Sequence, residues 1–472
     1  MTRPYELIVL SASSSGELAA AARGLARFLT GRPDLPLAAV AGSLVHDRPR
    51  LPHRLALVAR DCADAARRLQ APGARETHVG HAKSDGRQVA LLFPGVGDHY
   101  PGMAAGLYRS EPIFRSSLDH CADVLMEHLG RDLREILFPP DSEPAPPADG
   151  PGGGLDLSRL LGRHERTTEL DRTAVAQPLV FAVEYALAEF LTSAGVRPTA
   201  LAGYSLGEYV AACAAGVLAP RDALELVARR AKLIEGAPEG AMAAVMLGAD
   251  QLAGHLDGEL SLSAADGPRL SVVAGRVAAV ERLERRLAAE GVASLRLPTR
   301  HAFHSLMLEP FEEALRDLAA GFPLAAPAVP LLSNVTGTWL TAAEARSPRY
   351  WAQQMHRTVR FADELAELWR LPAPILVEAG AGRTLGTLAQ QHPGRRPDGT
   401  VISTLPTSAA RDQDVAGVLT ALGRLWVEGV DLNWPVLYPD RPGERLPHAP
   451  FEDDEAETGR SGRIARFVDR EP

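Results

Sequence analysis

The sequence predicts an α/β protein with three parts: a small α/β domain, a large subdomain, and a small subdomain inserted into the large one. Two observations carry this prediction. Short apolar runs of strand length alternate with stretches of helical periodicity along most of the 472 residues. In addition, one internal segment has a strand–helix–strand–strand–helix–strand order within about 60 residues, which is enough for a separate sheet with two helices.

The first 85 residues predict the small α/β domain. An apolar run at Tyr5–Leu10, a helical stretch after Ser15 and a second apolar run at His53–Arg60 are its candidate elements. A polar, glycine-containing stretch at Gly73–Arg87 follows, and we place a domain boundary near residue 86.

Residues 86–240 predict the first part of the large subdomain. Val89–Phe93 is a candidate buried strand, Ala174–Ala194 a helix, Thr199–Ala202 a short strand and Arg221–Ile234 a second helix. Between them, Pro139–Gly154 contains almost nothing that can be buried, so we expect a solvated loop without chemistry.

Residues 241–300 carry the βαββαβ order and predict a ferredoxin-like small subdomain. Residues 301–405 return to the large subdomain, with candidate strands at Val329–Asn334 and Pro374–Glu378. Residues 406–472 are expected to form a tail with one helix at Val415–Gly429, a proline-rich stretch and a charged end.

Composition excludes several classes of function. The formal net charge of −9 argues against a protein that tracks nucleic-acid phosphates. The three cysteines are too few and too scattered for a disulfide framework or a zinc cluster, and they indicate a reducing compartment, with the cytoplasm as the expected location. We find no signal-peptide pattern and no uninterrupted apolar run long enough for a bilayer, so no membrane partner is expected.

The pentapeptide Gly203-Tyr204-Ser205-Leu206-Gly207 lies between a candidate strand and a candidate helix. This is the context of a nucleophile elbow, in which a tight turn needs glycines and presents the serine hydroxyl at a helix start, as in an α/β-hydrolase-like subdomain. The helix dipole and free N–H groups there favour negative charge on a substrate oxygen. The simpler alternative is a glycine-rich connection without chemistry.

Six segments together resemble the acyltransferase domains of modular type I polyketide synthases and, more distantly, malonyl-CoA:acyl carrier protein transacylases. They are LLFPGVGDHYPGM, GYSLGEYVAACAAGVL, VARRAKLIEGAPEGAMAAV, HAFHSLML, SNVTG and YWAQQMHRTVRF. Residues 1–85 are similar to the linker between ketosynthase and acyltransferase, and residues 406–451 to the linker after the acyltransferase, where LPHAPF stands near the end. The resemblance therefore covers nearly the whole chain.

This resemblance implies a role for five residues in acyl transfer. Ser205 is the nucleophile and His304, at the end of HAFH, is its general base. A main-chain carbonyl, assigned to Gln354, orients the histidine in place of an aspartate. The N–H groups of Leu206 and Val96 form the oxyanion hole. No metal is implied.

Four further residues are implied in substrate selection. Arg230 matches the arginine that holds the free carboxylate of a malonyl-type substrate, and a guanidinium offers a planar fork for that group. Phe303 and His301 belong to the HAFH form that is associated with malonyl rather than methylmalonyl units. Tyr204 replaces the usual histidine, and Asp98 and His99 also depart from the family pattern, so these three departures bear on fine substrate preference. Val96 replaces the usual glutamine, but its main-chain N–H should preserve the oxyanion hole.

The expected function is therefore the loading of a malonyl-type unit from acyl-CoA onto the phosphopantetheine thiol of an acyl carrier protein, through a seryl ester. The expected partners are that carrier protein, malonyl-CoA or a related dicarboxylic acyl-CoA, and a ketosynthase; the chain binds no cofactor of its own. Arg300, Arg357 and Arg360 are candidates for a local basic face. Two alternatives stay open: a serine hydrolase or thioesterase that delivers the acyl group to water, and a decayed scaffold domain that docks a ketosynthase.

Overall fold

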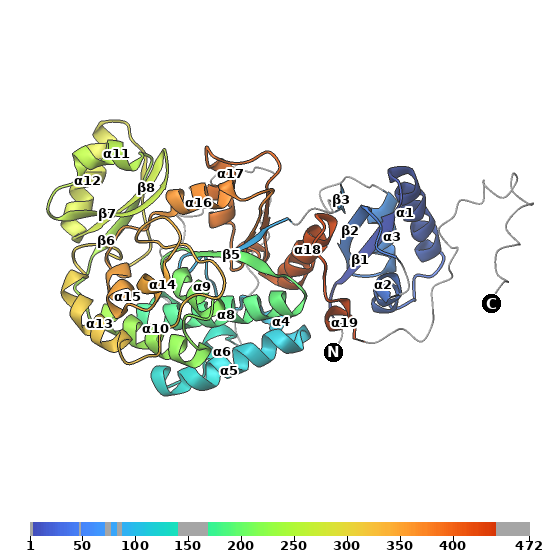
Figure 1. Cartoon of the computed structure of the whole chain (residues 1–472), viewed down its shortest axis with the longest axis horizontal. Helices are drawn as coiled ribbons and strands as arrows, with labels where there is room; N and C mark the ends of the chain where they lie inside the picture. The colour runs from blue at the N-terminus through green and yellow to red at the C-terminus, as the bar shows by residue number, and fades with distance from the viewer. Residues whose placement is uncertain (1–2, 47–48, 71–76, 83–86, 140–168, 440–472) are drawn as a thin grey trace, which may run out of the picture. The chain divides into compact units, whose positions relative to one another are not determined.

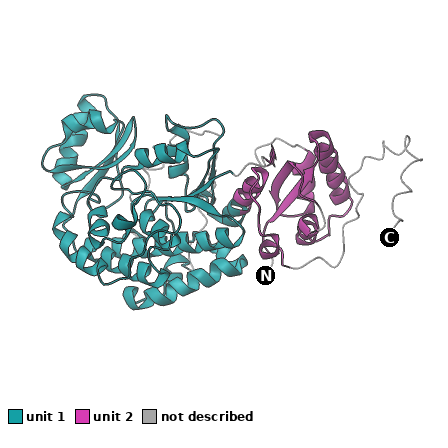
Figure 2. Ribbon diagram, in the orientation of Figure 1, with its two compact units in different colours: residues 1, 87–418 teal, residues 2–86, 419–472 magenta. Residues whose placement is uncertain are grey.

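The computed structural model describes residues 3–46, 49–70, 77–82, 87–139 and 169–439 (Figure 1). The chain divides into two compact units, and Figure 2 shows them in different colours: unit 1 contains residues 87–418, and unit 2 contains residues 2–86 and 419–472. The predicted boundary near residue 86 is adjacent to this division. The tail is not separate as expected, because helix α18 (Asp414–Val427) runs across the second boundary.

A parallel sheet forms the centre of unit 1. Its strand order is β11-β10-β4-β5, with bounds β4 Val89–Phe93, β5 Pro198–Gly203, β10 Ile375–Glu378 and β11 Thr400–Ser403. Strand β4 is apolar at all five positions and buried at all five, as expected for a strand covered on both faces. The carboxyl ends of β4 and β5 lead directly into the two turns that build the site described below.

The predicted strand at Val329–Asn334 is present only as isolated bridges. Leu331 pairs with Leu201 of β5 in parallel fashion, and Leu332 pairs with Trp339. Pro330 has no N–H to donate, and Ser333 N already bonds to Thr338 O at 2.9 Å, so the chain turns away after two residues of pairing.

Helices α5 (Pro112–Leu129), α8 (Thr173–Ser193) and α10 (Pro220–Glu235) form a layer on one side of this sheet (Figure 1). Among the described residues, α8 is long and apolar enough to cross a membrane, yet 89% of its apolar window is buried inside the protein. Packing as a central helix accounts for its composition. Among the described residues of unit 1 outside the inserted small subdomain, the other helices are α4 Ala105–Ser110, α6 Leu133–Leu137, α9 Gly207–Ala214, α13 Glu312–Ala319, α14 Ala342–Ala345, α15 Pro348–Gln354, α16 Phe361–Arg370 and α17 Thr384–Gln391, with the short turns η1 Glu169–Asp171, η3 Glu309–Phe311 and η4 Ser408–Gln413.

The inserted small subdomain has the predicted ferredoxin-like topology. Its antiparallel sheet has the order β7-β8-β6-β9, and its bounds are β6 Ala241–Val245, α11 Ala249–Leu252, η2 Ala253–His255, β7 Leu260–Gly267, β8 Leu270–Gly275, α12 Val277–Ala289 and β9 Ser294–Arg296. In α12, the buried positions Ala279, Val280, Leu283 and Leu287 recur at helical spacing, so one face of the helix packs on the sheet.

Unit 2 is a three-stranded antiparallel sheet with helices: β1 Glu6–Ala12, α1 Ser15–Thr30, α2 Leu37–His46, β2 His53–Ala59, α3 Cys62–Gln70, β3 Thr77–His81, the end of α18, and α19 Trp434–Leu437. Sequence reasoning missed β3, because its residues are polar and it pairs only with β2 at the sheet edge. The tail is fastened to the first strand, since Tyr438 Oη accepts a hydrogen bond from Leu7 N at 3.0 Å. Most of the predicted loop at Pro139–Gly154, and the segment from residue 440 onward, lie outside the described residues.

Candidate active site

Ser205 lies on a strained turn between β5 and α9. Its φ angle is +55°, in the left-handed region that non-glycine residues rarely adopt. The flanking glycines are required by close approach: a Cβ on Gly203 would lie 2.0 Å from Gly207 C, and a Cβ on Gly207 would lie 2.0 Å from Phe93 O. The turn therefore has the geometry that the pentapeptide predicts: on either side of the serine, the main chain packs so closely that only glycine fits.

The structure brings Ser205 and His304 together across 99 residues of sequence. Ser205 Oγ lies 2.7 Å from His304 Nε2, a hydrogen-bond distance at which the imidazole can take the hydroxyl proton. His304 Nδ1 lies 3.0 Å from Arg357 O, so this ring nitrogen donates and Nε2 is the acceptor. The pair is a nucleophile and a base oriented by a main-chain carbonyl, without a carboxylate.

The carbonyl of Gln354, predicted to orient the histidine, acts on the imidazole together with that of Arg357, three residues later. Helix α15 ends at Gln354, and sequence spacing alone does not reveal that the chain after it brings the second carbonyl to the histidine. Gln354 also contacts the site through its side chain: its Nε2 donates to Ser205 O at 2.7 Å.

Asn334 is a site residue that sequence reasoning did not assign. Its Oδ1 accepts from Ser205 N at 2.7 Å, while its Nδ2 donates to Gly203 O at 2.5 Å and to Glu364 Oε1 at 2.7 Å. The main-chain N–H and C=O of the nucleophile are thus both held by side chains from distant segments. The SNVTG segment was part of the family resemblance and contains Asn334, but nothing in the sequence indicated this contact.

The pKa of His304 is strongly depressed. Burial lowers it to about 3, and the positive charge of Arg230 acts in the same direction, while the carbonyls of Arg357 and Gln354 oppose the shift. The imidazole is therefore neutral at physiological pH, which is the state that a general base needs. Arg230 is linked by geometry to the helix that follows Ser205, because its guanidinium carbon lies 5.1 Å from the ring centre of Tyr209 on α9.

Leu206 N and Val96 N are available for an oxyanion. Leu206 stands at the N-terminus of α9, and Val96 lies in the turn after β4. In the described part of the chain, neither N–H donates to another group of the protein. The two turns are in contact, because a Cβ on Gly95 would lie 2.6 Å from Tyr204 O. Both donors thus belong to adjoining turns beside Ser205, as the oxyanion prediction requires.

Arg230 is almost completely buried, with 1% of its surface exposed. Its Nη1 donates to Gln177 Oε1 at 2.6 Å, and its guanidinium carbon lies 5.1 Å from the centre of the Tyr209 ring. Within the described ranges, no carboxylate lies within ion-pair distance of the guanidinium, and the buried Nε has no hydrogen-bond partner. The buried carboxyl of Glu208 acts on this cation only from beyond ion-pair distance, so the guanidinium can still bind an anionic group of a ligand.

A buried polar cluster lies beneath the nucleophile helix. Tyr350 Oη donates to Glu208 Oε1 and lies 2.6 Å from Ser333 Oγ. Burial raises the pKa of Glu208 to about 7, whereas hydrogen bonds from Tyr350 and Gln354 and the charge of Arg230 lower it. Sequence reasoning missed this cluster, because Glu208 follows the nucleophile motif on a helix and reads there as an ordinary helical residue.

Besides Arg230, the three residues expected to select the substrate occupy two places. His301 Nδ1 lies 2.9 Å from Thr173 Oγ1, and its ring centre lies 6.1 Å from that of Phe303. Tyr204 turns toward the small subdomain, where its hydroxyl lies 3.4 Å from Asp266 Oδ2. Burial raises the pKa of Asp266 to about 7. Tyr204 therefore joins the nucleophile turn to the small subdomain.

Two of the three arginines proposed for a basic face are in ion pairs, Arg300 with Glu239 at 2.5 Å and Arg360 with Asp363 at 2.7 Å. The third, Arg357, is exposed and has no ion-pair partner among the described residues. Across the same residues, no group of three or more His, Cys, Asp or Glu side chains is placed to hold a metal ion.

Residues 90–431 match the family model described as acyl transferase domain, and residues 6–69 match the model described as CurL-like, PKS C-terminal. The chain belongs to the acyltransferase domains of type I polyketide synthases. A phenolphthiocerol/phthiocerol polyketide synthase polypeptide of Mycobacterium tuberculosis is 34% identical to this acyltransferase over 463 residues, which cover 94% of the chain and 29% of that polypeptide. The chain thus spans under a third of that relative's length.

Solved structures agree with this assignment. The acyltransferase domain of ZmaA is 30% identical, with a TM-score of 0.83 over 95% of this chain and 99% of that one. The acyltransferase domain of SpnD, solved in complex with 2-(pent-4-yn-1-yl)malonyl, is 38% identical, with a TM-score of 0.79 over 91% and 97% of the two chains. The α/β prediction, including its inserted small subdomain, is confirmed.

Proposed function

We propose that this acyltransferase loads a malonyl-type unit from acyl-CoA onto an acyl carrier protein, through an ester on Ser205. One observation carries the proposal: the hydroxyl–imidazole pair at 2.7 Å shares its surroundings with the buried, unpaired guanidinium of Arg230. The serine and histidine carry out the acyl transfer, and the guanidinium recognises a free carboxylate on the substrate.

In the first half-reaction, Ser205 Oγ attacks the thioester carbonyl carbon and its proton passes to His304 Nε2. The carbonyl oxygen becomes an oxyanion, which the N–H groups of Leu206 and Val96 stabilise. When the carbon–sulfur bond breaks, the coenzyme A thiolate takes the proton from His304 and leaves as the thiol. Arg230 holds the distal carboxylate throughout.

In the second half-reaction, the phosphopantetheine thiol of the carrier gives its proton to His304 and attacks the seryl ester. The carbon–oxygen bond breaks and Ser205 recovers its proton from the imidazole. No other group is needed, because His304 accepts a proton from the attacking group and returns it to the leaving group in each half-reaction.

A carrier protein and a ketosynthase are thus the proposed partners. The three buried free thiols suit a reducing cytoplasm as the proposed location.

Arg230 and Phe303 support a malonyl substrate. The guanidinium selects an acyl group with a free carboxylate, and the SpnD domain at 38% identity was solved with a substituted malonyl group. Phe303, half-buried beside His301, is proposed to occupy the space that a 2-methyl branch needs. A preference of this kind is worth about 1–3 kcal/mol, so it tunes the choice rather than making it absolute.

Two observations favour transfer over the alternatives. A hydrolase that releases neutral acyl groups has no use for a buried, unpaired arginine, whose burial is costly without an anionic ligand. A decayed scaffold has no need to keep the serine in a left-handed turn at hydrogen-bond distance from a neutral imidazole.

The test is to mix the chain with malonyl-CoA and follow coenzyme A release together with the intact mass. We expect a malonyl adduct that is absent in Ser205→Ala and that disappears, with carrier loading, when a holo-carrier protein is added. Rapid loss of the adduct to water without carrier loading would support the hydrolase. No adduct in the wild-type chain would support the decayed scaffold.

A further inference from the structure

Helix α8 presents three polar side chains to the site on one face. Thr173, Gln177 and Glu184 are each buried, with at most 6% of their surface exposed. They are spaced four and seven residues apart, and residues at these spacings share one side of an α-helix. The rest of the buried part of α8 is mostly apolar, so these polar groups require partners.

Gln177 holds Arg230. Its Oε1 accepts from Nη1 at 2.6 Å, which fixes one edge of the guanidinium. An amide oxygen can do this without charge, so the cation stays available for a substrate carboxylate. A glutamate at the same position would neutralise it.

Glu184 holds the turn that carries Val96. Its Oε1 accepts from Gly95 N at 2.8 Å, one residue before the proposed oxyanion donor. Gly380 lies against the same carboxyl group, since a Cβ there would lie 3.0 Å from Oε1. Burial raises the pKa of Glu184 well above its usual range, and the nearby carboxyl of Glu378 adds to the shift. The carboxyl oxygen acts as the hydrogen-bond acceptor for the turn.

We propose that Gln177 and Glu184 are positioning residues for the two ends of the acyl substrate: Gln177 aims the carboxylate-binding arginine, and Glu184 fastens the oxyanion turn. This proposal rests on the function proposed above. The two residues are separated by seven positions, about 10 Å along a helix axis. Because α8 packs between α5, α10 and α9, one rigid element sets both placements.

The two contacts predict different kinetic signatures. Loss of the Gln177 contact affects only substrates with a carboxylate, whereas loss of the Glu184 contact affects every acyl group through the shared oxyanion. The Gln177 signature does not depend on the folded fraction, because malonyl-CoA and acetyl-CoA are compared in the same sample. For Glu184 the control is the conservative variant Glu184→Gln.

The experiment measures seryl-ester formation from malonyl-CoA and acetyl-CoA in the full chain and in four variants. In Gln177→Glu and Gln177→Leu, we expect the malonyl-to-acetyl ratio of kcat/KM to fall about tenfold or more, with acetyl loading largely kept. In Glu184→Ala, both rates should fall by about tenfold to a hundredfold at an unchanged ratio, and Glu184→Gln, which keeps an acceptor oxygen, should restore most of the loss.

An unchanged ratio in both Gln177 variants, with wild-type malonyl loading intact, would refute the role of Gln177 while leaving the proposed function standing. Equal impairment by Glu184→Ala and Glu184→Gln would refute the acceptor role of Glu184. A wild-type chain that loads acetyl-CoA in preference to malonyl-CoA would overturn both the proposed function and the Gln177 inference.

Discussion

Arg230→Ala tests the recognition of the carboxylate most directly. The guanidinium is buried and makes no direct ion pair in the described protein, so a bound malonyl carboxylate would complete a buried pair. Removing one member of such a pair typically costs about 3–5 kcal/mol, which corresponds to a factor between about 10² and 10⁴ in kcat/KM. Acetyl-CoA carries no carboxylate, so its loading should be unchanged or higher.

A second readout separates recognition from a structural effect. The charge of Arg230 is one cause of the low pKa of His304, so removing it should move the acid limb of the pH–rate profile to higher pH. Arg230→Lys keeps the charge but lacks the planar fork, so it should preserve the pH profile while still impairing malonyl loading.

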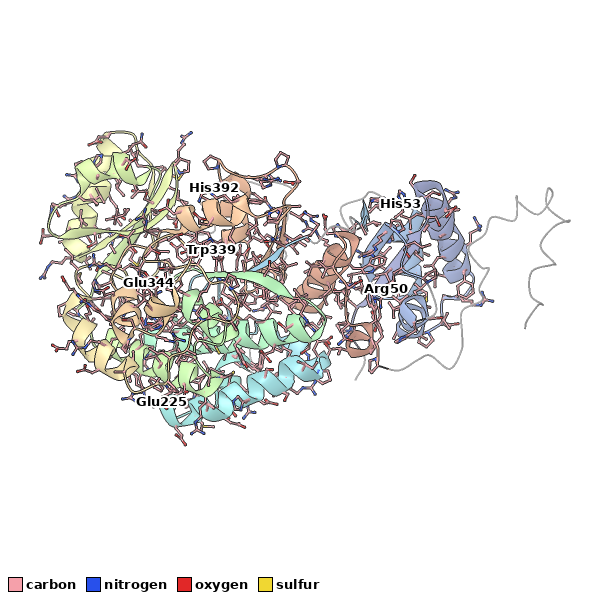
Figure 3. The ribbon with its side chains drawn as sticks, in the orientation of Figure 1. Arg50, His53, Glu225, Trp339, Glu344 and His392 are labelled. Carbon is pink, nitrogen blue, oxygen red and sulfur yellow. The ribbon has the colours of Figure 1, made fainter. Side chains whose placement is uncertain are left out.

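The matched control is Arg229→Ala. Arg229 is half-exposed and pairs with Glu225, labelled in Figure 3, at 3.1 Å on the same helix. An exposed pair of this kind contributes about 0–1 kcal/mol, so loading should change little. Kinetics of coenzyme A release with both substrates, from about pH 3 to 8, provide the assay, since the pKa of His304 is about 3. Equal loss of malonyl and acetyl loading in Arg230→Ala would refute the carboxylate role.

Four further outcomes are expected. Asn334→Ala removes three hydrogen bonds around the nucleophile turn, so ester formation should fall by at least about tenfold in stopped assays, and Asn334→Asp, which keeps only the acceptor, should recover part of it. Gly207→Ala places a Cβ 2.0 Å from a main-chain oxygen and should abolish ester formation or lower the unfolding temperature, whereas Gly254→Ala, which meets nothing within 4 Å, should do neither. Because the pKa of His304 is lowered to about 3, kcat/KM should show no acid limb near pH 6.5, and a limb at 6.5 would contradict the assignment. Below pH 6.5 the unfolded chain binds a proton at His304 that the folded chain does not, so the free energy of unfolding should decrease as the pH falls toward 3. Phe303→Ala should raise methylmalonyl relative to malonyl loading by about 10-fold or more in a competition assay, and an unchanged ratio would exclude Phe303 as the selecting wall.

Much of the architecture was predictable because its signals are local. Strand β4 and helix α10 were found within one or two residues of their bounds, since apolar runs and helical spacing are properties of neighbouring residues. The strand predicted at residues 329–334 was wrong as a full strand, because its length depends on what lies beside it. Strand β3 was missed for the same reason, since only its pairing with β2 defines it.

The sequence by itself determined which reactive groups this protein has: a serine between two indispensable glycines, a histidine in HAFH and an arginine 25 residues after the serine on a helix. Tertiary structure alone decided what holds them. His304 is oriented by the carbonyl of Arg357 as well as by that of Gln354, Ser205 N donates to Asn334, and Arg230 donates to Gln177. A motif preserves chemical identity over a few residues, but a hydrogen bond between residues 53 or 129 positions apart exists only once helices and strands have packed.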